Sequence, residues 1–177
     1  MINTSLMHTF AWWPTILAVI IASITDLRSR RIPNWLVFPF LVSGFLTSIY
    51  TRGWNGVWNG LSGFAVGALV CGLLAFLGGM GMGDVKLCAA IGMWVGPGQL
   101  ISALVLTGIA GGAMALGWAV LGGFLTSALD NLLDLIRHMG KRGLRPHPEL
   151  TIHNKSARSM PYAPAIAIGT LLSFLAR

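Results

Sequence analysis

The amino-acid sequence predicts an all-α membrane protein of about six transmembrane helices, with an amphipathic helix and a loop on the cytoplasmic side. Three observations predict this class: the composition, the apolar stretches and the placement of the basic residues. Of 177 residues, 55% are hydrophobic and only 10% are charged, whereas about 25% of the residues of a soluble domain are charged. No polar stretch is long enough for a second core, so we expect one membrane-embedded domain over residues 1–177.

A helix needs about 20 mostly apolar residues to cross the hydrocarbon core of a bilayer. The candidate spans are residues 9–25, 35–51, 57–78, 85–96, 100–123 and 161–176. The fourth stretch is short, so we expect it to be tilted, to meet the fifth at a kink near Gly96-Pro97-Gly98, or to begin inside the membrane. No basic residue precedes the first stretch and no cleavage site follows it, which argues against a removable signal peptide.

The basic residues predict how these spans are oriented. Residues 28–31 hold three arginines after the first span, Lys86 begins the fourth, and six more basic residues follow the fifth. If these ends face the cytoplasm, ten of the twelve basic residues lie inside and only Arg52 and Arg177 lie outside. The positive-inside rule then places the N-terminus outside. A net charge of +7 distributed in this way fits anionic lipid headgroups better than nucleic acid.

The segment after the fifth span differs from the others. Residues 125–138 carry leucine and isoleucine on one helical face and charged residues on the other. This pattern predicts an amphipathic helix on the cytoplasmic membrane surface, or else a cytoplasmic continuation of the fifth span. The polar stretch at about 139–159, rich in glycine and proline breaks, is expected to be a flexible loop.

Two of the five acidic residues, Asp26 and Asp84, adjoin predicted spans. Two spans separate them, so the chain crosses out and back and both lie near the cytoplasmic face. Asp26 can simply end the first span and pair with Arg30 one turn later, and Asp84 can be an N-cap. Ionisable residues at membrane depth are costly and usually functional, however, which favours a shared role.

A run of glycines precedes Asp84: Gly78, Gly79, Gly81 and Gly83. Glycine weakens a helix, allows positive φ and lets another backbone approach closely. The alternative is helix packing, a common use of glycine in membrane spans.

Paired carboxylates can hydrolyse a peptide bond without a metal when one is protonated and the other is ionised. Two like charges close together favour such a shared proton. The helix dipole suggests that Asp84, at a helix start, ionises more readily, and that Asp26, at a helix end, keeps the proton.

These residues resemble the type IV prepilin peptidases, which are intramembrane aspartic proteases with a G-x-G-D motif. Gly81-Met82-Gly83-Asp84 matches that motif, and Asp26 stands where the family has its first catalytic aspartate, ahead of Ile32-Pro33-Asn34. The stretch MPYAPAIAIG at 160–169 is similar to a pattern in the last span. The resemblance extends over residues 15–175 and implies that Asp26 and Asp84 are catalytic.

Five residues are expected to support the two aspartates: Gly81, Gly83, Lys86, Pro33 and Asn34. Lys86 can neutralise Asp84, reach the headgroups or touch the substrate. Pro33 and Asn34 are expected to set the turn and cap the second span.

The resemblance implies cleavage of the basic leader of prepilins at the cytoplasmic face of the bacterial inner membrane. Larger members also carry a cysteine zinc site and methylate the new N-terminus. No such insertion separates the first two spans here, and no C-x-x-C pair occurs. We therefore expect the short Flp/Tad-type form, without methyltransferase activity, metal or other cofactor, and with Cys71 and Cys88 as small buried residues.

Other interpretations remain open at this point. A small transporter could use the same aspartates as proton or cation sites, and a scaffold protein could use them as helix caps. Gly60-Leu61-Ser62-Gly63 is similar to the G-x-S-G of rhomboid serine proteases, but no histidine lies within a span to activate Ser62. Small-residue helix packing explains this stretch better.

Overall fold

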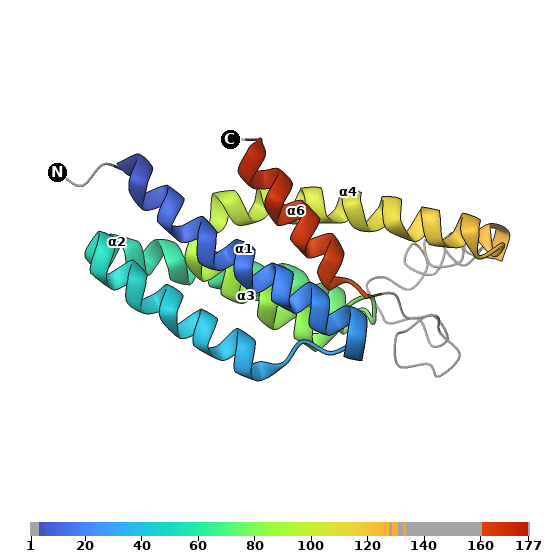
Figure 1. Cartoon of the computed structure of the whole chain (residues 1–177), viewed down its shortest axis with the longest axis horizontal. Helices are drawn as coiled ribbons and strands as arrows, with labels where there is room; N and C mark the ends of the chain where they lie inside the picture. Colours follow the sequence, from blue (N-terminus) through green and yellow to red (C-terminus); the bar gives the residue numbers. More distant parts are fainter. Residues whose placement is uncertain (1–3, 128, 131–132, 134–160, 177) are drawn as a thin grey trace.

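The computed structural model of this chain describes residues 4–127, 129–130, 133 and 161–176. All regular structure in this part of the chain is helical, which confirms the predicted all-α class. The helices pack lengthwise into a bundle, and one end of α4 extends beyond the others (Figure 1). They are α1 (Thr4–Ser29), α2 (Asn34–Phe76), α3 (Met82–Val95), α4 (Pro97–Leu121) and α6 (Ala163–Leu175).

Helix α2 is a hairpin of two helical halves that meet at Gly53. The φ of 57° and ψ of −142° at Gly53 are non-helical, and glycine adopts them because it has no Cβ. In Figure 1 the chain turns back within α2, so that the second half of this helix returns along the bundle. The two halves correspond to the predicted spans at 35–51 and 57–78.

The second half of α2 packs closely on α3 through small residues. A Cβ at Gly63 would meet the backbone carbonyl of Gly92, and one at Gly67 would meet the backbone of Cys88 and Ala89. Ser62 is exposed, and its Oγ donates to the backbone oxygen of Asn59 at 2.9 Å. Helix packing, and not a serine nucleophile, therefore explains the G-x-S-G stretch.

The chain breaks between α3 and α4 at Gly96, close to the predicted kink. Its φ of 79° favours glycine, and Pro97 follows as the first residue of α4. Helix α6 packs antiparallel on α4. Gln99, near the start of α4, donates through Nε2 to the backbone oxygen of Ser173 near the end of α6 at 2.8 Å. Gly111, further along α4, lies against Tyr162, just before α6 begins. Cys71 and Cys88 are both buried in the core, as predicted.

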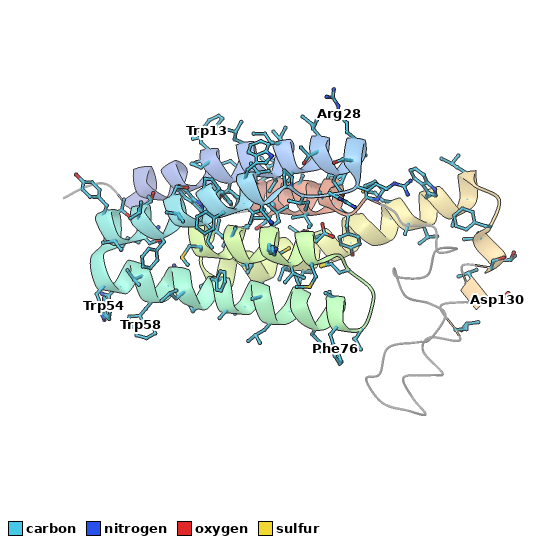
Figure 2. The ribbon with its side chains drawn as sticks, turned by 90° about the horizontal axis from the view of Figure 1, so that it is seen from below. Trp13, Arg28, Trp54, Trp58, Phe76 and Asp130 are labelled. Carbon is cyan, nitrogen blue, oxygen red and sulfur yellow. The ribbon has the colours of Figure 1, made fainter. Side chains whose placement is uncertain are left out.

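The outer surface of the bundle is apolar, as a lipid-facing surface should be. In the part of the chain that the structure describes, two helices, α2 and α4, are long and apolar enough to cross a membrane. Trp13, Trp54, Trp58 and Phe76 all point outward in Figure 2, and each is more than half exposed. Six crossings and an outside N-terminus stay predictions.

The predicted amphipathic helix lies only partly within the described residues. Residues 125–127, 129, 130 and 133 are helical, and Leu129 and Leu133 are each 49% exposed. The remaining residues of 125–138 and the predicted loop at 139–159 lie outside the described part of the chain.

Candidate active site

Asp26 and Asp84 line one cavity of about 290 Å³ at the end of the bundle where α1 ends and α3 begins. They are only 7% and 9% exposed, although 58 residues separate them in the sequence. The other lining residues come from the α1–α2 connection and the start of α3: Arg30, Arg31, Ile32, Gly81, Met82 and Gly83. The structure thus brings the two buried acids to one cavity, which two arginines also line.

Asp26 is held in place by the start of the last helix. Its Oδ2 accepts a hydrogen bond of 3.1 Å from the backbone N–H of Ala163, the first residue of α6. Ser23 Oγ shares its one proton between the backbone oxygen of Val19 on its own helix at 2.7 Å and that of Ala163 at 3.1 Å, which adds a second contact between α1 and α6. A free N–H at a helix start favours a negative charge, and a buried carboxylate needs such a donor.

The expected ion pair between Asp26 and Arg30 is absent from the described residues. The contact that joins them is a backbone one, in which the N–H of Arg30 donates to the carbonyl of Asp26 at 2.8 Å. Arg30 closes α1 with a left-handed φ of 51°, which turns the chain away from the helix axis.

Asp84 is the third residue of α3 and not its N-cap, which is Gly81. The N–H of Asp84 donates to the carbonyl of Gly81 at 3.1 Å, and no side-chain hydrogen bond caps this helix. The N-cap interpretation was therefore wrong by three residues.

Both carboxyl groups thus lie at the start of a helix, since Asp84 is in the first turn of α3 and Asp26 accepts from the first N–H of α6. The predicted difference between them assumed that Asp84 alone had this advantage. That assumption was wrong because α6, distant in sequence, supplies the corresponding donor to Asp26.

The glycines of the G-x-G-D motif provide space. A Cβ at Gly81 would lie 3.2 Å from Asp84 Oδ2, and one at Gly83 would lie 3.2 Å from Ile32 Cβ. Gly81 has an ordinary extended φ of −76°. Of the four glycines before Asp84, Gly78 alone has a positive φ, of 81°.

Lys86 and Asn34 lie beside the cavity but do not line it. Lys86 Nζ donates to Asn34 Oδ1 at 3.3 Å, and both residues line a second cavity of about 450 Å³. Pro33 is the N-cap of α2, and no side-chain hydrogen bond caps this helix. The expected cap by Asn34 is therefore wrong, and the pairing of Lys86 with Asp84 is not observed.

Two contributions to the cavity had no settled assignment from the sequence. Arg30 and Arg31 were interpreted chiefly as orientation determinants, with a contribution to the site left open, and both line the cavity. The Ala163 N–H lies in the stretch at 160–169 that the family resemblance singled out without a role. Among the described residues, no group of three or more His, Cys, Asp or Glu side chains could hold a metal ion.

Comparison with known proteins identifies the family. A profile of the type IV leader peptidase family matches residues 13–116, a region that contains both aspartates. The prepilin leader peptidase/N-methyltransferase of Bacillus subtilis is 29% identical over 163 residues, which cover 89% of this chain and 52% of the relative. No solved structure matches the chain.

Two further relatives agree. The preflagellin peptidase of Methanococcus maripaludis is 35% identical over 83 residues, or 45% of this chain and 36% of the relative. The prepilin leader peptidase/N-methyltransferase of Aeromonas hydrophila is 30% identical over 122 residues, which cover 62% of this chain and 42% of the relative. The chain spans about half or less of the length of these relatives. The matched profile and the paired aspartates within it show that this chain belongs to the type IV leader peptidase family.

Proposed function

We propose that this chain is an aspartic endopeptidase that removes the leader from prepilins, with Asp26 and Asp84 as its catalytic pair. The observation that carries the proposal is the shared cavity, in which two buried carboxyl groups from distant segments face the same space. Family membership supports the reaction class, and the names of the relatives support the substrate class.

The proposed reaction needs one proton shared between the two acids. The ionised carboxylate takes a proton from water, whose oxygen attacks the scissile carbonyl carbon, while the protonated carboxyl group donates to the carbonyl oxygen. As the tetrahedral diol collapses and its C–N bond breaks, the first carboxyl group gives its proton to the leaving amine. The second carboxylate takes a proton back from one diol hydroxyl, which restores the starting protonation state. Repulsion between two like charges opposes the doubly ionised pair and so favours this starting state.

The first turns of α3 and α6 give the pair its orientation in this proposal. The N–H of Ala163 donates to Asp26, and Asp84 is the third residue of α3, so the packed helices position both carboxyl groups before substrate binds. Arg30 and Arg31 line the same cavity, so their positive charges lower the cost of the negative charge that remains there.

We further propose a Flp-type prepilin as substrate and the cytoplasmic face of the bacterial inner membrane as the place of cleavage. The basic leader would stay in the cytoplasm while the apolar helix of the substrate lies among the spans. The charge asymmetry of the sequence supports this orientation, because the cavity lies at the end that carries residues 28–31 and Lys86. Methyl transfer is not part of the proposal.

The test is leader removal from a Flp-type prepilin co-expressed with this chain in a bacterial host and followed by mass spectrometry. Asp26→Asn and Asp84→Asn should each lower the rate by at least about 10²–10⁴-fold while the protein remains folded. Asp130→Asn is the matched control, because Asp130 is exposed and points away from the bundle (Figure 2). Normal processing by either cavity variant would exclude the catalytic pair.

A further inference from the structure

A second cavity, which we call the α2–α3 groove, lies between α2 and α3 beside the aspartate cavity. It encloses about 450 Å³, and the side chains of both halves of α2 meet α3 there. Phe38, Phe64 and Ala68 contribute to its apolar walls, while Asn34 and Lys86 are its polar residues. Both polar residues lie near the start of their helices, so the groove is apolar along its length and polar at one end.

Lys86 brings a positive charge to that end. Its side chain is exposed, and Nζ donates to Asn34 Oδ1 at 3.3 Å, which uses one of its three donors. Among the described residues, no carboxylate lies within ion-pair distance of Nζ. Asp84 lies two positions away on α3, but it faces the other cavity, since residues two apart on a helix do not share a face.

The apolar walls and the charge together indicate the occupant. The apolar walls suit an acyl chain, and the ammonium group of Lys86 attracts an anionic headgroup but repels the basic leader of a prepilin. Lysine at the end of a membrane span reaches toward headgroups and attracts anionic lipids. We propose that the α2–α3 groove binds an acyl chain of an anionic phospholipid, with the phosphate at Lys86 and Asn34.

This site would act on the first turn of α3 from the side opposite the aspartate cavity. Val85 and Lys86 line the groove, and Asp84 lines the cavity. A bound lipid would therefore pack against the same helical turn that carries one of the two aspartates. The proposal concerns binding alone and does not depend on peptidase activity.

The experiment is native mass spectrometry of the purified full chain in detergent, titrated with phosphatidylglycerol or with a diacylglycerol of the same acyl chains. The wild-type chain should retain phosphatidylglycerol more tightly than diacylglycerol, which has no phosphate. Lys86→Gln should weaken phosphatidylglycerol binding about fivefold and leave diacylglycerol unchanged, and Lys86→Arg should keep the preference. Arg28→Gln is the charge-matched control, because Arg28 is exposed near the same end and lines neither cavity.

A second pair of variants tests the apolar part of the groove. Ala68→Leu fills it and should weaken binding of both lipids, whereas Ala65→Leu, on the exposed face of the same helix, should weaken neither. Unchanged phosphatidylglycerol binding in Lys86→Gln, or an equal loss in Arg28→Gln, would overturn the proposal. These two charge variants decide the outcome even if Ala68→Leu fails to fold.

A photoreactive phenylalanine analogue at position 38 identifies the occupant in membranes. Phe38 lines the groove and is 67% exposed, so the analogue should be tolerated. Cross-linking to phospholipid that Lys86→Gln lowers supports the proposal, because bulk lipid would label both chains equally. Cross-linking to prepilin instead of lipid would assign the groove to the substrate helix and contradict it.

Discussion

The backbone N–H of Ala163 donates a 3.1 Å hydrogen bond to Oδ2 of Asp26, so the start of the last helix orients a side chain at the end of the first. The same residue accepts a hydrogen bond from Ser23 Oγ through its carbonyl oxygen. Helix α6 thereby belongs to the wall that supports the aspartate cavity. Four predictions follow from this cavity and from the packing around it.

Ser23→Ala should lower the rate of leader removal about two- to tenfold, because it removes one of the two bonds that position α6 against Asp26. Thr25→Ala is the matched control, since Thr25 Oγ1 bonds only to carbonyls of its own helix. The measurement is the rate constant in a purified assay, with the melting temperature recorded for both variants. Equal losses of rate in the two would contradict a positioning role for Ser23.

Gly81→Ala should lower the rate about tenfold or more, with little change in stability. The new methyl group would lie 3.2 Å from Asp84 Oδ2 and move the carboxyl group, and small displacements at a reacting centre are costly. Gly79→Ala serves as control, because a Cβ there meets no atom closer than 3.5 Å. Wild-type rates in Gly81→Ala would show that the position of this carboxyl group does not limit catalysis.

The dependence of kcat/KM on pH should be bell-shaped. At low pH both carboxyl groups are protonated and no base remains, whereas at high pH both are ionised and no acid remains. The two apparent pKa values of this profile belong to the pair and not to either residue. Initial rates with purified protein across the pH range, checked against folding at each pH, measure this, and a single sigmoidal step would argue against a dyad.

Gly63→Ala should lower the free energy of unfolding by about 1–3 kcal/mol, because its methyl group would meet the backbone carbonyl of Gly92. Gly108→Ala on α4 should be neutral or stabilising, since a Cβ there meets nothing within 4 Å and alanine favours a helix. Unfolding in mixed micelles with increasing SDS measures both. Similar values for the two variants would show that α2 and α3 can separate without cost.

Several features followed from local sequence alone. The helical class came from long apolar stretches, and the break at Gly96 came from a glycine next to a proline. Successive spans cross the bilayer in opposite directions, so the number of spans between two residues tells whether they lie on the same side. Two predicted spans separate Asp26 from Asp84, and both could therefore be expected at one end of the bundle before any contact was known. Their shared cavity agrees with that expectation.

One error could have been avoided from the sequence. Lys86 was expected to be able to neutralise Asp84, yet residues two apart on a helix point to different faces. The helix that carries both residues sends Asp84 to one cavity and Lys86 to another.

By itself the sequence determined the helices, their breaks and the end of the bundle at which the two acids lie. The length of an apolar stretch and the conformation of a glycine depend on neighbouring residues alone, and the side of the bilayer follows from the number of spans. Only the tertiary structure decided which backbone N–H meets Asp26, that Arg30 and Arg31 line the cavity, and that Gly81 and Gly83 supply room. These relationships depend on which helices pack together and at what separation. Contacts between residues as distant as Asp26 and Ala163 exist only once the helices have packed.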